Sequence, residues 1–261
     1  MAMVIPPTNS MNGTTVCERH DDCVSIRLAN GDANALTTEV LLELRASIGQ
    51  ARKLQQGVLL CGGAKFFSNG VDLDWALTRN SQQMREMFLE LGNAILDLLE
   101  CKEPVVAAIR GHAIGGALAL FLTADYRYSA NGRVLLGKPE VLMGVPNPFF
   151  GDQLLRFVAS DYVASDLIYS GRLVTGEDAR ALHLVHEVAD KESIEALALD
   201  KLVELKQLTH DAFSESKDMR NQNICARIRA QMSARVARQV EIWNTPEAQA
   251  KLRLAAQRLS R

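Results

Sequence analysis

The sequence predicts an α/β fold built on parallel strands. Up to about residue 190, short apolar runs alternate with longer segments of helical period. Parallel strands need such crossover helices to connect them. With 261 residues, 48% of them hydrophobic, the chain is also long enough to bury a large core.

The elements follow one another in a regular order. Alternating VSIRL at 24–28 predicts a half-buried strand, and Thr37 or Thr38 can cap a helix that runs to about Lys53. Further strands are predicted at 58–61, 105–109, 126–129 and 134–136. Between them, residues 81–100 place Met, Phe, Leu and Ile side chains at helical spacing, and Pro104 then breaks the chain.

Two segments end buried strands with small residues. They are GGAKFFSNGVDLDWAL at 62–77 and GHAIGGALALFLTAD at 111–125. Glycine lets the backbone approach a ligand closely, and the first N–H groups of a helix point outward with no acceptor. One such N–H from each segment would form an oxyanion hole, although many strand–glycine–helix connections are purely structural.

Composition excludes several classes of function. A net charge of -2 without a basic patch argues against a nucleic-acid partner. No apolar run reaches the ~20 residues that span a bilayer, so no membrane partner is expected. Five scattered cysteines and the absence of a secretory signal favour a reduced, cytoplasmic location. Residues 1–12 are expected to form a loose arm.

Neither candidate metal cluster is convincing. CERHDDC spaces Cys17, His20 and Cys23 evenly, but this matches no common zinc frame and a fourth ligand would be needed. A polar hairpin turn is the simpler interpretation. His183 and His186 are expected near a surface strand ahead of Glu187. We therefore predict no metal.

The chain changes character from about residue 190. It becomes rich in Ala, Leu, Lys, Arg, Glu and Gln, which predicts two or three amphipathic helices. Their apolar stripes must be buried, either against the core of the same subunit or against a second subunit. Stripe residues are Leu197, Leu202, Leu205, Ile224, Ile228, Met232, Val236 and Val240.

Four motifs in order resemble one family. FFSNGVDL, EPVVAAIRGHAIGGALAL, LLGKPEVLMGV and SGRLVTGEDARALHLVHEV are similar to segments of the crotonase, or enoyl-CoA hydratase/isomerase, superfamily. The resemblance implies a crotonase-like spiral of ββα units over residues 1–195. It also implies a C-terminal helical region at 196–261 that supports homotrimers or hexamers.

The resemblance implies an acyl-CoA thioester as substrate and no other cofactor. The backbone N–H groups of Val71 and Gly116 would hold the thioester oxygen as it becomes negative. Other implied contacts to the substrate come from Lys65, Phe67, Asp72, Leu73 and Gly115. For Lys65 a solvated side chain is an equal alternative, and for Asp72 turn capping is the simplest interpretation.

The number of matching carboxylates limits which reaction of the superfamily is expected. Hydratases of the superfamily use two glutamates; one matches Glu140, but the other falls on Ala119. A single base suits removal of a proton at C2 and its return at C4, which is the Δ3-Δ2 enoyl-CoA isomerase reaction. Alternatives are another single-base enzyme (hydratase, decarboxylase or C–C lyase) and a non-catalytic acyl-CoA-binding paralogue.

The segment after Glu140 departs from the glycine-rich run of hydratases. GVPNPFFGDQLL at 144–155 carries four bulky residues, Pro146, Pro148, Phe149 and Phe150, which are expected to wall the pocket and exclude water. The alternative is that they only pack a loop. Asp152 is expected to cap the helix that follows, with an auxiliary role in the site as the alternative.

Overall fold

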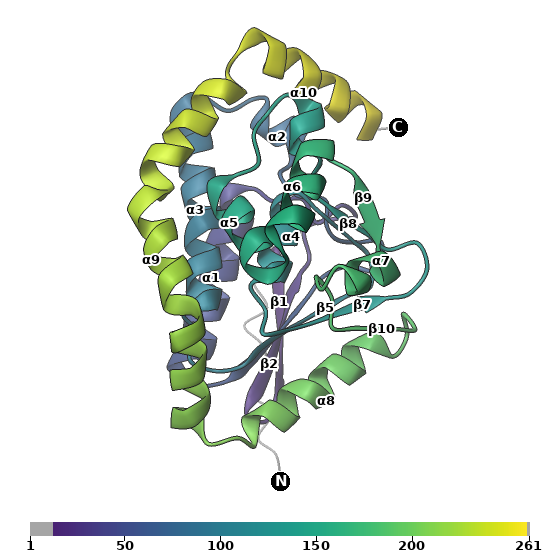
Figure 1. Cartoon of the computed structure of the whole chain (residues 1–261), viewed down its shortest axis with the longest axis vertical. Coiled ribbons are helices and arrows are strands. Elements are labelled where there is room, and N and C mark those ends of the chain that lie inside the picture. Colours follow the sequence, from purple (N-terminus) through teal and green to yellow (C-terminus); the bar gives the residue numbers. More distant parts are fainter. Residues whose placement is uncertain (1–12, 260–261) are drawn as a thin grey trace.

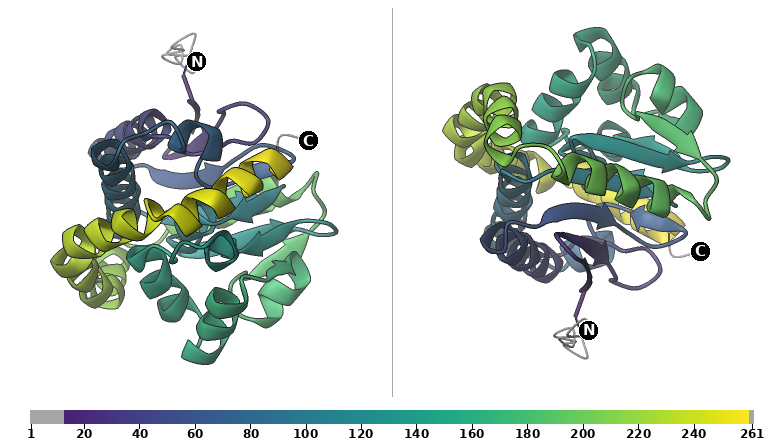
Figure 2. Two further views of the ribbon diagram at one scale, coloured as in Figure 1. Left: turned by 90° about the horizontal axis from the view of Figure 1, so that it is seen from above. Right: turned by 90° about the horizontal axis from the view of Figure 1, so that it is seen from below.

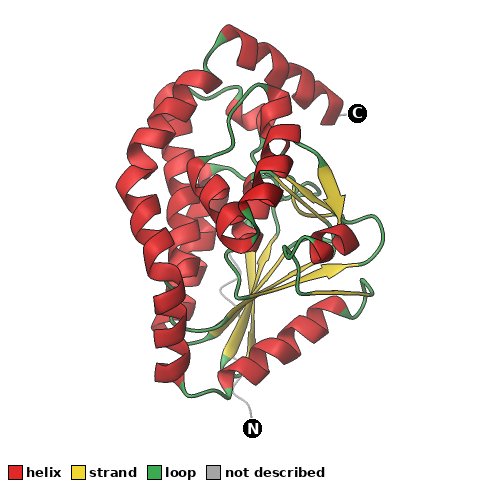
Figure 3. Ribbon diagram, viewed as in Figure 1, coloured by secondary structure: helices red, strands yellow, loops and turns green. Residues whose placement is uncertain are grey.

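A computed structural model describes residues 13–259 of the chain, so the predicted loose arm at 1–12 lies outside the described residues. Strands gather in the interior and helices lie around them (Figure 3). The strands are β1 (Thr15–His20), β2 (Cys23–Leu28), β3 (Gly57–Cys61), β4 (Phe66–Ser68), β5 (Val105–Ile109), β6 (His112–Ile114), β7 (Tyr126–Ala130), β8 (Leu135–Gly137), β9 (Leu173–Thr175) and β10 (Glu187–Ala189). The helices up to the tail are α1 (Thr38–Lys53), α2 (Leu73–Ala76), α3 (Ser81–Leu99), α4 (Gly116–Leu122), the 3-10 helix η1 (Pro139–Met143), α5 (Phe149–Val158), α6 (Asp161–Ser170) and α7 (Gly176–Ala181).

Two sheets form the spiral. The first has the order β1-β2-β3-β5-β7-β10 and is parallel apart from the β1–β2 pair. The second has the order β4-β6-β8-β9, with only β8–β9 antiparallel. Each turn of the chain gives one strand to each sheet and then a helix, as in β3-β4-α2 and β5-β6-α4. The predicted α/β fold, a crotonase-like spiral of ββα units, is confirmed.

Helix starts follow local capping chemistry. The Thr37 hydroxyl accepts a hydrogen bond from the Val40 N–H, so the predicted cap of α1 is confirmed. Asn80 and Gln83 form a reciprocal capping box at the start of α3. The apolar face of α3 is buried, as its period predicts.

Of the second-sheet strands, the one predicted at 134–136 is present as β8 (Leu135–Gly137), whereas the other three were not predicted from periodicity. Strands β4, β6 and β9 have three residues each, which is too short for an alternation to be visible. The N-terminal strand β1 was also missed because most of its side chains are exposed. The hairpin turn predicted between Cys17 and Cys23 is confirmed, since β1 and β2 pair antiparallel with His20 opposite Cys23.

Two absences concern residues 13–259 only. No group of three or more His, Cys, Asp or Glu side chains in this range is placed to hold a metal ion. None of the helices in this range has the length and apolar character needed to cross a lipid bilayer. The strand expected after His186 is present as β10, which begins at Glu187.

The tail forms three helices, which are α8 (Ile194–Lys206), α9 (His210–Trp243) and α10 (Pro246–Leu259). Helix α8 packs against β3, β5 and β7, while α9 runs beside α3 and α5 (Figure 1). Helix α10 crosses the end of the molecule over α2 and η1 (Figure 2). Most of the predicted stripes are thereby buried against the same chain, Leu197 being an exposed exception.

Ion pairs to two carboxylates of the spiral attach the tail, and the pair with Lys217 is the most buried of them. The Lys217 ammonium of α9 lies 2.7 Å from the Asp125 carboxylate and donates to the Glu103 carbonyl oxygen, with its side chain 4% exposed. Glu103 in turn pairs with Lys206 and with His210. Because Asp125 also accepts from the Val105 N–H, one carboxylate ties α9 to the start of β5.

Replacing this buried cation should destabilise the protein strongly. In Lys217→Met the Asp125 carboxylate stays buried without its partner, so we expect the free energy of unfolding to fall by about 3–5 kcal/mol. Arg238→Met is the control, because the pair of Arg238 with Glu241 is exposed and its loss should change stability by less than about 0.5 kcal/mol. Urea denaturation at one protein concentration measures both, and equal midpoints would contradict the expectation.

Candidate active site

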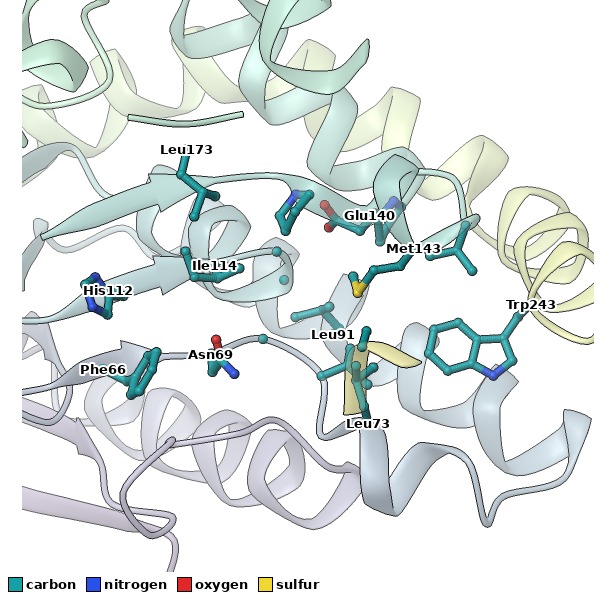
Figure 4. Close-up of a pocket in the computed structure, with 18 of the residues that line it drawn as sticks. Phe66, Asn69, Leu73, Leu91, His112, Ile114, Glu140, Met143, Leu173 and Trp243 are labelled. Atoms are coloured by element: carbon teal, nitrogen blue, oxygen red, sulfur yellow. The ribbon is translucent and has the colours of Figure 1, made fainter. Parts of the chain in front are cut away.

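A cavity of about 380 Å³ lies between the carboxyl ends of the second-sheet strands and the tail helices. Its wall is mostly apolar, with Phe88 and Leu91 from α3, Met143 from η1 and Trp243 from α9. Figure 4 shows Phe66, Asn69, His112, Ile114 and Glu140 among the side chains that surround it. An apolar chamber with a few polar groups is typical of a small-molecule site.

The first glycine segment brings the Val71 N–H to this cavity. Leu36 pairs with Val71 in a parallel bridge through the Gly70 carbonyl and the Asp72 N–H. Successive backbone groups of an extended chain point to opposite sides, so the N–H of Val71 points away from Leu36. Within the part of the chain that the structure describes, no backbone acceptor is found for this N–H.

The second glycine segment supplies another such N–H. Gly115 has a φ of 60°, which turns the chain from β6 directly into α4. Gly116 is the first residue of α4, so its N–H precedes the intrahelical ladder, and it too has no backbone acceptor among residues 13–259.

Close packing brings the two segments that carry these N–H groups into contact. Gly70 has a φ of 79°, and a Cβ built on it would lie 2.7 Å from the Ile114 carbonyl oxygen and 3.5 Å from the Gly116 nitrogen. Only glycine allows this approach of two backbones. Val71 and Gly116, whose N–H groups have no backbone acceptor among the described residues, both line the same cavity.

The Glu140 carboxylate lies next to these donors. Its Oε1 is 3.4 Å from the position that a Cβ on Gly115 would occupy, and the residue is 7% exposed. Neither carboxylate oxygen has a hydrogen-bond partner in the structure, although the Lys138 ammonium lies 3.1 Å from Oε1. A buried carboxylate with free oxygens is available to take a proton from a bound molecule.

Comparison with known proteins then identifies the family. The model of the enoyl-CoA hydratase/isomerase family matches residues 18–255. The chain belongs to this family. It is 30% identical over 179 residues to enoyl-CoA delta isomerase 3 of Arabidopsis thaliana, a match that covers 66% of this chain and 75% of that protein. It is 29% identical over 165 residues to a crotonyl-CoA hydratase of Syntrophomonas wolfei, covering 62% and 63%.

Two further comparisons concern the length of the relatives and their fold. The human peroxisomal bifunctional enzyme is 30% identical over 207 residues, which cover 78% of this chain, but the chain spans only 27% of that enzyme's length. The crystal structure of human mitochondrial Δ3-Δ2-enoyl-CoA isomerase superposes with a TM-score of 0.90 over 95% of this chain and 98% of that one. At 24% identity this likeness shows the shared fold.

The site residues predicted from the resemblance to this family can now be compared with the structure. The structure places Val71, Leu73, Gly115, Gly116 and Glu140 in the cavity wall. Lys65 is exposed above the Phe66 ring, and Phe67 is fully buried against Phe121 in the core. Asp72 caps α2 by accepting from the Trp75 N–H, which is the capping role that the sequence favoured.

Two expectations for the segment after Glu140 need correction. Phe149 and Phe150 do not wall the cavity, because Phe150 is buried near Gly92 of α3 and Phe149 faces the Arg235 guanidinium of α9 at 5.4 Å. Pro148 of the same run does line it. Asp152 does not cap a helix, since α5 begins at Phe149 and Asp152 pairs with Arg156 one turn later.

Some cavity residues were missed by sequence reasoning. His112 lines the wall and accepts a hydrogen bond from the Leu135 N–H at Nδ1, so its ring proton is on Nε2. Burial, followed by the charges of Arg133, Lys191 and Lys65, lowers the pKa of His112. The sequence could have indicated His112, because it lies between a buried strand and the Gly-Gly pair. Arg258 of α10 also lines the cavity, and nothing in the sequence around it indicated this.

The approach of Gly70 to Ile114 is open to a direct test. Alanine at Gly70 must both adopt a positive φ and displace a backbone carbonyl, whereas alanine at Gly132 adopts a φ of 77° in open space. We expect Gly132→Ala to lower the free energy of unfolding by about 1–2 kcal/mol and Gly70→Ala to lower it by more. Denaturant titration of both variants measures the difference. Equal losses would show that the two segments do not press on each other.

Proposed function

We propose that this family member is a Δ3-Δ2 enoyl-CoA isomerase in which Glu140 moves the proton. The observation that carries the proposal is one buried carboxylate with free oxygens beside two free backbone N–H groups. Among the described lining residues Glu140 is the only Asp or Glu. The reaction needs no cofactor besides the coenzyme A thioester itself.

The proposed reaction is a proton transfer in two steps. Glu140 takes a proton from C2 of a 3-enoyl-CoA, and the C–H electron pair delocalises over C2 to C4 and onto the thioester oxygen. The N–H groups of Val71 and Gly116 stabilise the charge on this oxygen. Protonated Glu140 then returns the proton to C4. The double bond moves from C3–C4 to C2–C3, and the carboxylate is regenerated.

The rest of the cavity supports this chemistry. The reacting carbons would be surrounded by the apolar side chains of Leu91, Met143 and Trp243. This leaves little room for water that could protonate the carbanion-like intermediate. Exclusion of water also strengthens the interaction of the two N–H groups with a negative oxygen. Arg258 and the exposed Lys65 are the cations that we assign to the nucleotide end of coenzyme A.

Hydration of a 2-enoyl-CoA is the second candidate. It is favoured by relatives named as hydratases at 29% identity, a level close to that of the plant isomerase. The side chain at 119 argues against it, because Ala119 is fully buried in α4 and offers no second acid to position water.

Glu140→Gln should remove most of the isomerase activity. A general base contributes about 10²–10⁴-fold to the rate, so kcat for conversion of 3-hexenoyl-CoA should fall at least ~100-fold. The ultraviolet absorbance of the conjugated thioester follows the reaction. Asp152→Asn is the matched control and should keep its activity, since Asp152 pairs with Arg156 and does not line the cavity.

The outcome separates the candidate functions. Fast hydration of crotonyl-CoA with slow isomerisation by the wild type would replace the isomerase by the hydratase. Tight binding of acyl-CoA with no turnover of either compound would indicate a non-catalytic paralogue. Full activity in Glu140→Gln would refute the assigned base.

We also propose that the chain assembles as a homotrimer or as a hexamer of two trimers. Large apolar side chains of η1 and α6 are left exposed on the single chain, among them Leu142, Tyr162 and Tyr169 at 63%, 84% and 72%. Such a patch is typical of an interface. Light scattering should give a molar mass in solution of three or six times the 28.7 kDa of one chain, and the mass of a monomer would contradict this.

A further inference from the structure

A fully buried lysine lies directly behind the candidate active site. Lys138 follows β8, its side chain is 0% exposed, and it is not part of the cavity wall. Its ammonium donates to the Gly115 carbonyl oxygen at 3.0 Å and lies 3.1 Å from Oε1 of Glu140. One cation therefore contacts both parts of the site, the oxyanion segment and the base.

The contact with Gly115 acts on the N–H of Gly116. The Gly115 carbonyl and the Gly116 N–H belong to the same planar trans peptide, so they point in opposite directions. A charged donor on the oxygen fixes the plane of this peptide from behind. It also draws electron density from the amide and makes the N–H a stronger donor, as in other hydrogen-bond chains.

The contact with Glu140 holds the carboxylate at the cavity. The atoms are at ion-pair distance but outside hydrogen-bond geometry, so the carboxylate oxygens keep their lone pairs for a substrate proton. The other ionisable side chains on the cavity wall are His112 of β6 and Arg258 of α10. Lys138 is the cation within ion-pair distance of this carboxylate in the described chain.

Helix α5 leaves the space that the ammonium occupies. A Cβ added to Gly151 would lie 2.8 Å from Nζ of Lys138 and 3.3 Å from Oδ1 of Asn147. Gly151 lies in the first turn of α5, where alanine would be the better helix former. A buried ion pair is also weak support for stability, because desolvation offsets the attraction. Stability alone therefore gives little reason for this arrangement.

We propose that Lys138 is a positioning residue that aligns the oxyanion-hole peptide of Gly115 and Gly116 and holds Glu140 beside it. The inference rests on the proposed acyl-CoA site. It makes the hole and the base one unit, so a change at Lys138 alters both polarisation of the thioester and proton transfer without contact to the substrate.

The test uses three variants and two readouts. Lys138→Met removes the charge and the donor, and Lys138→Gln keeps a donor without the charge. Gly151→Ala pushes the ammonium away and keeps its charge. Gly49→Ala is the control, because Gly49 also lies within a helix, α1, and an added Cβ there meets nothing within 4 Å. The readouts are the absorbance maximum of bound 3-phenylpropenoyl-CoA, and kcat and KM for 3-hexenoyl-CoA.

We expect the wild type to move the absorbance of the bound probe to longer wavelength, because a polarised thioester carbonyl lowers the energy of the transition. Lys138→Met and Gly151→Ala should lose most of this shift and lower kcat about 10–100-fold, less than complete loss of an oxyanion-hole donor. KM should change less than kcat, since the cavity wall is intact. Lys138→Gln should recover part of the shift, and Gly49→Ala should match the wild type.

The outcomes distinguish this inference from the proposed function. A wild-type shift that persists in Lys138→Met and Gly151→Ala would overturn the positioning role and leave the acyl-CoA site standing. Binding of the probe by the wild type without a shift would overturn the oxyanion hole and the inference together. If Lys138→Met does not fold, Gly151→Ala decides, because it retains every charge.

Discussion

The contact between the turn at Gly70 and the end of β6 is the constraint on which the site depends. Two strand-to-helix connections, about 45 residues apart in sequence, meet where neither has a side chain in the way. The second sheet brings them together, because β4 and β6 are neighbours in it and β8 follows with Glu140 just beyond its end. The spiral therefore converts three consecutive turns of chain into three adjacent parts of one site. Helices packed outside hold these turns in place but contribute few polar atoms.

Much of the first sheet could be predicted because its strands are buried on both faces. Residues such as Val58 to Leu60 and Val105 to Ile109 form continuous apolar runs, which are typical of parallel strands. In the second sheet β8 was predicted at 134–136, but the three-residue strands β4, β6 and β9 carry no such pattern, and only the family resemblance implied them. Burial of the α9 stripe against α3 and α5 was likewise one of two open alternatives, since an apolar face does not say which surface covers it.

The parts of the site that depend on backbone geometry could be predicted from the sequence, whereas the parts that depend on tertiary packing could be predicted less well. Glycine spacing indicated the two N–H groups, and the acid at 140 stood alone in its motif. Phe149 and Phe150 were misplaced because the helix starts four residues earlier than Asp152 capping would require, with Pro148 rather than Asp152 as its N-cap, and neither ring lines the cavity. Lys138 gave no signal, because a lysine next to a proline in a loop is typical of a solvated side chain. Its burial follows from the helix that passes at Gly151.

Helix α10 makes the enclosure of the cavity depend on the last helix that the structure describes. Ala255 and Arg258 line the cavity together with Trp243 from α9, although Val71, Gly116 and Glu140 all lie before residue 145. A chain that stopped before α10 would keep these three residues but would lack part of the wall around them. The polar groups of the cavity and its closure to solvent therefore lie in separate parts of the sequence.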